Sequence, residues 1–509
     1  MQICQIEVFS HGVKVTGIQV AAMQVLREYA LQLVQYKVEK VRQRFVRTAE
    51  RVFAASTADR SEWRFHRHEL PSLLEAFERR GYKQDLHVKM VYVPEFPLAK
   101  ADVKMPATWV PRDDQGPIIE YITAEGHTKV VTLQTGRGKT ACALKAGEIL
   151  GHRMLVTVLG RYMEKWKGDL IDNYNLKPQE LVVVRGQKQL HTLLEAAHTG
   201  QLPTQLKAVL VSTDTMADYI ALYEATRFIA LPKHLVPPER IYEVLQVGFR
   251  IIDECHQNFH ANFKIDLYTH IPKALYLSAT LESDNQFIDK MYKVAYPMSM
   301  RVNGGKYVQY CNVVNIEYQL NEPDKVKYKN KKGQYSQNDY ELWLMKDPKR
   351  LRNYLELIWN IAKVEYLSDY VEGQRLLILA GRTEMCGVIA KYIDDRLADH
   401  TVSKYTSEED YDILMTSDVS VSTYGSAGTA VDIADLTTCI CTIAMSASQA
   451  NLQILGRLRE LKLWPHRKPK FVYLTCLDVS SHRAYHEKKL ELFKGKALTH
   501  TSMTSRFRV

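Results

Sequence analysis

The chain has 509 residues, more than one hydrophobic core usually organises, so its length predicts two or three domains. Hydrophobic residues make up 46% and charged residues 25%, which is ordinary for a globular protein and excludes a long disordered polymer. The 68 Lys and Arg residues exceed the 58 Asp and Glu residues, which favours a polyanionic partner.

Cysteine spacing and hydropathy give expectations about location. The eight cysteines are scattered and form no pair of CxxC units with zinc-ligand spacing, so we expect reduced, mostly buried thiols. The first residues lack a basic segment followed by an apolar one, and no run of about 20 apolar residues occurs. These features predict a soluble, cytoplasmic protein with no membrane partner.

The first region, 1–105, predicts a small α+β accessory domain that binds nucleic acid. It begins with a strand pattern, continues with a helical run over 20–53, and then shows Pro71 near a helix start and Gly81 as a helix stop. Arg64 and Arg67 alternate with aromatic residues, which suits stacking on a nucleic-acid strand. A half-buried strand with basic flanks explains the same pattern equally well.

Two later regions alternate short apolar runs with helical stretches, a rhythm typical of parallel α/β sheets. We expect one sheet domain over 106–300 and a second over 346–509, whose basic tail is helical from Ser480 and ends flexibly. The interval 301–345 is expected to be a connector or insertion. Its five lysines within 325–332 predict a solvated linker or a hairpin facing nucleic acid.

A glycine-rich segment, TGRGKT, stands between an apolar strand and an alanine-rich helix. Backbone N–H groups of such a loop surround phosphates, the lysine adds a point charge, and the hydroxyl that follows binds Mg²⁺. Leu133 stands where the GxxxxGK[ST] pattern has its first glycine, so the match is incomplete. The residues predicted to bind nucleotide are Thr135, Gly136, Arg137, Gly138, Lys139 and Thr140.

Two carboxylates follow the apolar strand FRII, at the sheet edge where parallel strands present ligands. Asp253 is predicted to hold Mg²⁺ through water, and Glu254 to polarise the attacking water. The neighbouring His256 either caps the turn or senses the γ-phosphate.

These segments resemble the motifs of superfamily 2 DExH-box helicases. The tetrad DECH resembles motif II, TGRGKT motif I, and the SAT sequence, with Ser278 and Thr280, motif III. The stretch from Arg112 to Gln115 resembles the Q motif, in which the glutamine reads adenine. The resemblance implies that His256, Ser278 and Thr280 couple hydrolysis to movement.

The second sheet carries two further resemblances. Thr423, Gly425, Gly428 and Asp432 match positions of motif V. Gln453, Gly456 and Arg457 match motif VI, whose arginine contacts the γ-phosphate; Glu460 replaces its second arginine, and Arg459 stands one position earlier. The resemblance therefore leaves open whether Arg457 or Arg459 stabilises the transition state.

The resemblance implies two tandem RecA-like domains after the N-terminal domain, forming a monomeric motor driven by ATP and Mg²⁺. It places nucleic-acid contacts on outer loops at Arg161, Thr213, Thr383 and Thr423. The size and the entry region are most similar to phage UvsW-type helicases, which implies a DNA helicase that remodels branched DNA in recombination, replication or repair in a bacterial host. An RNA helicase or transcript-releasing translocase, and an inactive nucleic-acid-binding scaffold, remain alternatives.

Overall fold

The computed structural model describes the chain except residues 1, 42–43, 227–235, 305–306, 407–411, 428–432 and 462. Its contacts divide the chain into two compact units: 1–133 with 137–304, and 134–136 with 305–509. The regions expected as 1–105 and 106–300 therefore belong to one unit. Among the described residues, no helix is both long and apolar enough to cross a membrane.

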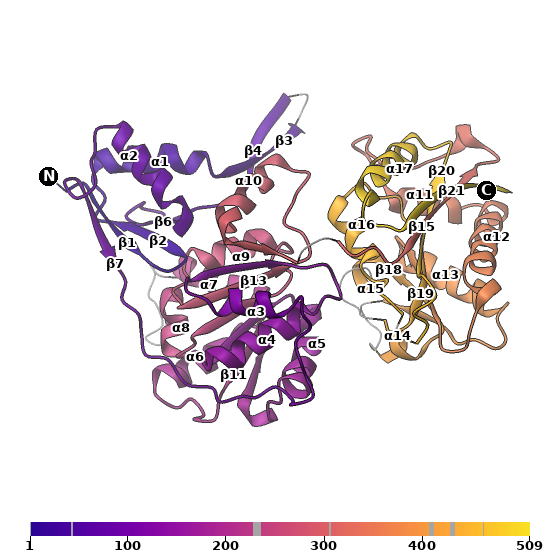
Figure 1. Cartoon of the computed structure of the whole chain (residues 1–509). Helices are drawn as coiled ribbons and strands as arrows, with labels where there is room; N and C mark the ends of the chain where they lie inside the picture. The colour runs from indigo at the N-terminus through magenta and orange to yellow at the C-terminus, as the bar shows by residue number, and fades with distance from the viewer. Residues whose placement is uncertain are drawn as a thin grey trace. The chain divides into compact units, whose positions relative to one another are not determined.

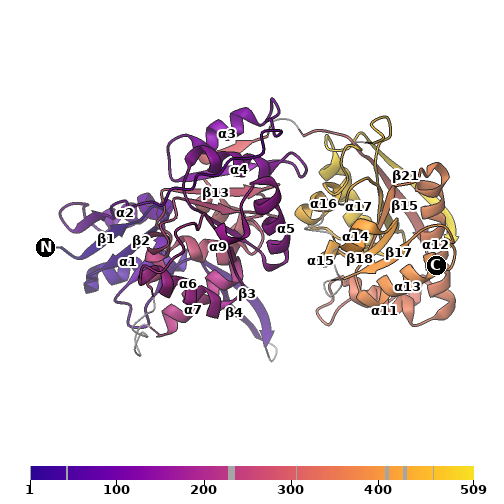
Figure 2. The same cartoon turned by 90° about the horizontal axis from the view of Figure 1, so that it is seen from below.

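The N-terminal part is a five-stranded mixed sheet with α1 and α2 on one face (Figure 1). The strand order is β5-β6-β2-β1-β7, with β1 and β7 parallel and the other pairs antiparallel. A separate two-stranded hairpin, β3–β4, projects from this part in both views (Figures 1 and 2). The elements are β1 Cys4–Val8, β2 Gly12–Thr16, α1 Val20–Leu31, β3 Val34–Val41, β4 Arg44–Val52, β5 Ala55–Ser56, β6 Trp63–His66, α2 Leu70–Arg79 and β7 Val88–Tyr92.

The helix expected over 20–53 is wrong beyond Leu31, because the chain turns there into the hairpin. Val34, Tyr36 and Val38 alternate with polar residues, a period of two that suits a strand. The expected helix at Pro71 is confirmed as α2, which begins one residue earlier, and Gly81 follows it with a φ of +83°.

The first large sheet is seven-stranded and wholly parallel, with the order β10-β11-β9-β12-β13-β8-β14. Its central strands are buried along their whole length, which explains their even apolar sequences. The strands are β8 Thr128–Thr132, β9 Met154–Val158, β10 Leu181–Val184, β11 Ala208–Ser212, β12 Phe249–Ile252, β13 Lys273–Ser278 and β14 Arg301–Asn303. The helices are α3 Gly116–Thr123, α4 Lys139–Leu150, α5 Met163–Gly168, α6 Gln187–His198, α7 Thr213–Thr226, α8 Ile241–Val244, α9 Phe259–Asp266 and α10 Gln286–Ala295.

The second unit holds another parallel seven-stranded sheet, with the order β17-β18-β16-β19-β20-β15-β21. The expected class, two tandem RecA-like parallel-sheet domains after a small α+β domain, is confirmed. The strands are β15 Asn312–Gln319, β16 Arg375–Ala380, β17 Val402–Tyr405, β18 Val419–Thr423, β19 Leu436–Cys441, β20 Lys470–Cys476 and β21 Thr499–Arg508. The helices are α11 Gln337–Met345, α12 Pro348–Glu365, α13 Thr383–Asp394, α14 Asp412–Thr416, α15 Tyr424–Ala427, α16 Ser448–Leu455 and α17 Ser480–Phe493.

Two segments differ from the sequence-based expectation. The interval 301–345 contains β14 of the first sheet together with β15 and α11 of the second unit, so much of it is regular structure. The expected flexible end after α17 is instead β21, an edge strand that pairs in parallel with β15. The sequence did not predict this strand because most of its residues are exposed and polar, as is common in a strand at the edge of a sheet.

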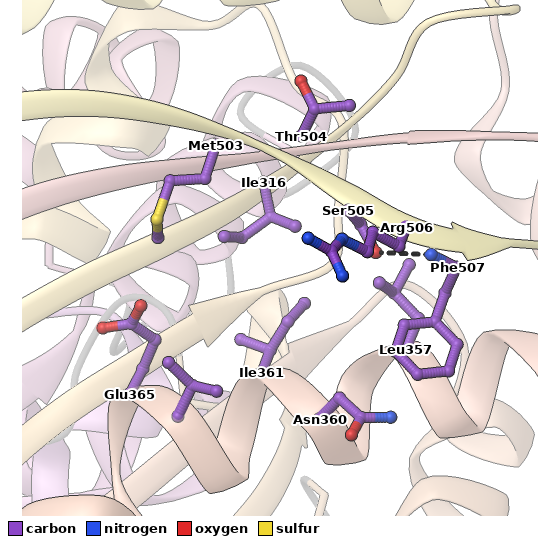
Figure 3. A pocket seen from close by; sticks show the side chains of 11 residues that line it. Ile316, Leu357, Asn360, Ile361, Glu365, Met503, Thr504, Ser505, Arg506 and Phe507 are labelled. Atoms are coloured by element: carbon purple, nitrogen blue, oxygen red, sulfur yellow. Dashed lines mark hydrogen bonds between the residues drawn. The ribbon is translucent and has the colours of Figure 1, made fainter.

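A cavity of about 240 Å³ lies between β21 and α12 (Figure 3). Ile316, Leu357, Met503 and Phe507 contribute to its walls, and the Phe507 N–H donates to Ser505 Oγ at 3.1 Å. The cavity is remote in sequence from every motif described above. All eight cysteines are free and buried, as expected.

The N-terminal domain is tightly packed against the first large sheet. Arg64 is 1% exposed and bonds Glu62 and Glu239, each at 2.7 Å, while its guanidinium lies over the Tyr268 ring. Gly12 approaches the end of α9 so closely that a Cβ there would lie 2.2 Å from the Leu267 carbonyl oxygen. Backbone contact and buried charge pairs thus join the two parts into one unit.

Two buried histidines in this junction make its stability depend on pH. Burial, and then the nearby positive groups, lower the pKa of His11 well below its usual value, and burial does the same for His66. In the unfolded chain both histidines have a pKa of about 6.5, so below that pH they bind protons that they do not bind in the folded chain. We expect the free energy of unfolding to fall as pH drops below about 6.5, by up to ~1.4 kcal/mol per pH unit for each histidine.

Urea unfolding of the full chain at pH 7.5, 6.5 and 5.5 measures this dependence. A His11→Asn variant, which cannot titrate at that position, should show a shallower decline in its midpoint than the original chain. Parallel declines in the two proteins would contradict the assignment to His11.

Candidate nucleotide and nucleic-acid site

The glycine-rich segment connects the end of β8 to the start of α4. Gly136 and Gly138 have φ values of +85° and +80°, in the left-handed region that favours glycine. The helix that follows begins at Lys139, and the first N–H groups of any α-helix lack intrahelical acceptors. The segment therefore has the backbone form of an anion-binding loop.

Gln115 lies directly against this segment. A Cβ at Gly138 would lie 2.3 Å from Gln115 Nε2, so only glycine fits beside the amide. Gln115 is 2% exposed; its Oε1 accepts from the Arg112 N–H at 3.0 Å, and its Nε2 donates to the Arg137 carbonyl at 3.3 Å. The amide thus braces the loop, and adenine recognition by Gln115 stays a prediction.

Charged groups reinforce the same contact. Arg112 donates to the Arg137 carbonyl at 2.7 Å, while Asp114 pairs with Arg112 at 3.1 Å and with Arg137 at 2.6 Å. Partial burial raises the pKa of Asp114, but the hydrogen bond and charge of Arg112 and the charge of Arg137 outweigh it, leaving the pKa below its usual value. The segment resembling the Q motif therefore fixes the loop in position.

The two predicted carboxylates stand at the carboxyl end of β12. Lys139 Nζ lies 3.1 Å from Glu254 Oε1, although 115 positions separate the residues. Glu254 has a φ of +48°, which is uncommon for a residue with a side chain and often marks a functional position. The lysine and the carboxylate predicted to serve phosphate and water are thus brought together.

Asp253 is held by a residue that the sequence did not single out. Trp166 Nε1 donates to Asp253 Oδ2 at 2.9 Å, and the Glu254 N–H donates to Oδ1 at 2.9 Å. Burial and then the neighbouring Glu254 charge raise the pKa of Asp253 above its usual value. A cation beside this carboxylate would offset both effects, so the environment favours a bound positive ion.

The oxygen groups here fit Mg²⁺. Mg²⁺ sites in nucleotide enzymes use one or two protein oxygens and complete the shell with phosphates and water. The Thr140 hydroxyl and the Asp253 carboxylate are oxygens of this kind. Across the described part of the chain, no group of three or more His, Cys, Asp or Glu residues could hold a metal ion by itself.

His256 connects the carboxylates to the neighbouring strand. Its Nδ1 lies 2.8 Å from Ser278 Oγ and 3.4 Å from Glu254 Oε2. Ser278 Oγ in turn accepts from the Thr280 N–H at 3.1 Å. Burial lowers the pKa of His256, which favours its neutral form. The structure therefore joins His256, Ser278 and Thr280 in one polar chain.

The candidate residues of the second unit are only partly brought together. The Tyr424 hydroxyl donates to Gln453 Oε1 at 2.8 Å, and Thr423 Oγ1 lies 3.0 Å from Ser426 Oγ. Arg457 is 8% exposed, whereas Arg459 is partly exposed. Gly428 and Asp432 lie outside the described residues. A phosphate contact by Arg457 or by Arg459 stays a prediction, with both alternatives open.

The predicted nucleic-acid contacts occupy different settings. Arg161 is exposed and donates to Gln257 Oε1 at 2.5 Å, and Thr383 is exposed as the first residue of α13. Thr213 is 2% exposed at the start of α7. The predicted nucleic-acid contact at Arg64 is wrong, because this side chain is buried in ion pairs with Glu62 and Glu239 and presents no surface to a nucleic-acid strand. Arg67 is partly buried.

A second supporting residue was also missed by sequence reasoning. Glu341 on α11 is fully buried and accepts the N–H groups of Gly381 and Arg382 at 2.7 and 2.8 Å. It thereby fixes the loop that precedes Thr383. Neither Glu341 nor Trp166 stands in a recognisable pattern, so only the fold reveals what they hold.

No family model and no curated protein matches the sequence. Solved structures with a similar backbone include the helicase domain of Pyrococcus furiosus Hef, at 12% identity and a TM-score of 0.43, covering 74% of this chain and 98% of that one. Saccharomyces cerevisiae Dbp5 bound to RNA and ADP BeF3 matches at 10% identity and a TM-score of 0.48, covering 77% and 90%.

Replacing Trp166 with Phe tests the role of its indole. Phenylalanine keeps an aromatic ring at this buried position but removes the indole N–H and part of the ring volume, so the hydrogen bond to Asp253 is lost; bonds to charged groups contribute about 1.5–3 kcal/mol. The smaller ring lowers the melting temperature of the ligand-free variant, so each protein is compared with its own ligand-free state. We expect Mg²⁺–ATP to raise the melting temperature less in Trp166→Phe than in the original chain. Equal stabilisation of both proteins would remove Trp166 from the site.

Proposed function

We propose that this protein is an ATP-driven nucleic-acid motor of the superfamily 2 helicase class. The observation that carries the proposal is the meeting of Lys139 and Glu254, 3.1 Å apart, beside the Trp166-held Asp253. A lysine at a glycine-rich loop and a carboxylate pair at the carboxyl end of another strand of the same parallel sheet are what phosphoryl transfer to water requires. Bound Mg²⁺–ATP would supply the phosphoryl group.

Each residue then has a distinct task. Lys139 contacts the outer phosphates, while Thr140 and Asp253 hold the cation. Glu254 orients the attacking water and accepts its proton. The Lys139–Glu254 ion pair suggests an order of events: phosphate draws the ammonium away, and the carboxylate becomes available to water only when nucleotide is present. The polar chain from His256 to Thr280 carries the change toward β13.

We further propose DNA as the track, with branched junctions, forks or displaced-strand loops as substrates in recombination, replication or repair. The support is the net charge of +10 and the similarity of the entry region to phage UvsW-type helicases. An RNA helicase or a transcript-releasing translocase would carry the same residues. An inactive scaffold is disfavoured by the geometry of Lys139, Asp253 and Glu254.

A panel of nucleic acids separates these functions. ATP hydrolysis is measured at one salt concentration with no nucleic acid, single-stranded DNA, duplex DNA, a four-way junction or single-stranded RNA, each beside Glu254→Gln. We expect the junction to stimulate turnover most, and Glu254→Gln to abolish it. Stimulation by RNA alone would select the RNA helicase; turnover that survives Glu254→Gln would overturn the assigned chemistry.

Lys139→Ala tests the phosphate loop directly. The side chain contributes a phosphate contact rather than core volume, so the variant should fold. Removing one group that stabilises a developing charge costs about 10²–10³ in turnover in other enzymes, and we expect at least that loss here. Lys145→Ala is the matched control, since Lys145 lies on the same helix in an ion pair with Glu148 at 2.8 Å. Normal turnover in Lys139→Ala would overturn the loop's assignment.

A further inference from the structure

The β3–β4 hairpin is the part of the N-terminal domain that its core does not explain. Within the described parts of the chain it forms a sheet of its own, in which the two strands pair only with each other. Val38 and Val46 are 62% and 40% exposed, so the hairpin buries little apolar surface. Two-stranded hairpins without a covered face are marginally stable in water. A projecting element of this kind is better explained by a partner than by the core.

The charge of the hairpin indicates what kind of partner it fits. Residues 34–52 include six Lys and Arg residues and two Glu residues. Lys37, Arg47 and Arg51 are exposed, and the Arg47 guanidinium lies 3.9 Å from the centre of the Tyr36 ring. Basic residues interleaved with an aromatic ring suit a nucleic acid, in which phosphates alternate with flat bases.

The register places these cations on both faces of the ribbon. Tyr36 is opposite Ala49 and Val38 opposite Arg47, which puts Arg47 on one face. Lys37 is opposite Thr48, and Gln35 is opposite Arg51, which puts Lys37 and Arg51 on the other face. A flat surface would meet only one face. A duplex groove has a phosphate wall on each side, so it can meet both.

The dimensions of the ribbon agree with a groove. Eight residues of β-strand extend about 27 Å, and paired strands lie about 4.8 Å apart. The major groove of B-form DNA is about 12 Å wide and admits a two-stranded β-ribbon. A-form duplexes have a deep, narrow major groove that side chains enter poorly.

The root of the hairpin is fixed to helix α9 of the first sheet domain. Phe53, fully buried directly after β4, packs against Phe259, His260 and Phe263 of α9, with ring centres 5.7, 5.1 and 4.9 Å away. His260 Nε2 also lies 2.8 Å from the Val52 carbonyl oxygen. Helix α9 begins three positions after His256, so the hairpin is anchored on the helix that follows the catalytic carboxylates.

We infer that the β3–β4 hairpin is a duplex-binding arm that enters the major groove of DNA. This rests on the proposed function and adds to it a second contact surface, with B-form duplex as the preferred substrate. Arg47 on one face and Lys37 with Arg51 on the other contact the phosphates of the two walls. Through Phe53, the arm holds the duplex at a fixed position relative to α9.

The test replaces Lys37, Arg47 and Arg51 together with Gln. Fluorescence anisotropy with labelled duplex DNA, at several salt concentrations and without ATP, measures the affinity. Losing three phosphate contacts should reduce the slope of log affinity against log salt by about 2.7 and weaken binding by about 10-fold or more. Binding to single-stranded DNA should change much less.

Two further variants serve as controls. Arg79, Lys83 and Lys89, exposed elsewhere on the same domain, are replaced with Gln to remove the same charge, and this variant should bind duplex like the original chain. Exchanging Lys37 for Arg, with Arg47 and Arg51 for Lys, keeps the charge and should retain the slope. Circular dichroism checks that all variants fold.

The outcomes separate this inference from the proposed function. If the original chain binds duplex and hydrolyses ATP but the Gln variant keeps its slope, the motor stands and the arm is overturned. Equal losses on single-stranded and duplex DNA, or on A-form RNA duplex and DNA duplex, overturn the groove assignment. If nucleic acid does not stimulate ATP hydrolysis by the original chain, the proposed motor function is overturned. The anisotropy measurement still decides whether the hairpin binds duplex DNA.

Discussion

The candidate site depends on the parallel register of three neighbouring strands. β8, β13 and β12 lie side by side with all their carboxyl ends at one edge, and that edge receives the glycine-rich loop from one strand and the carboxylates from another. The 3.1 Å contact between Lys139 and Glu254 follows from this register rather than from proximity in sequence. The positive φ of Gly136, Gly138 and Glu254, the Gln115 brace and the Trp166 hydrogen bond adjust positions that the register has already brought together.

Sequence reasoning found the parts of the molecule whose signals are local. Buried parallel strands are continuously apolar, so most strands of both sheets were visible, and the glycine-rich loop and the carboxylate pair are short and contiguous. It failed where a residue's role depends on distant partners. Trp166 and Glu341 carry no pattern of their own. Arg64 has the sequence context of a surface cation, but its partner Glu239 stands 175 positions later. β21 was missed because an edge strand is half polar, and the hairpin because no glycine, proline or asparagine occurs between positions 34 and 52 to signal a turn.

The N-terminal domain shows how burial decides what a charge is for. Arg64 of the N-terminal domain is almost fully buried and is paired with Glu239 of the first sheet domain. Such a pair is costly to break because the remaining charge would be buried alone, so Arg64 helps to fix how the N-terminal domain sits on the sheet. Lys37, Arg47 and Arg51 of the hairpin are instead exposed. Within the N-terminal domain, the buried arginine thus stabilises the packing, whereas the exposed cations are available to a partner.

The position of β15 in the second sheet also bears on how the chain folds. Its neighbours on both sides, β20 and β21, come from much later in the sequence, and the β15–β21 hydrogen bonds join residues 187 positions apart. Forming such pairs requires closing long loops first, which slows folding. Until then β15, with its buried valines and isoleucine, presents two unpaired edges to other chains. During refolding of this unit, late strand pairing therefore competes with aggregation. Because aggregation depends on protein concentration, a low concentration favours the native sheet.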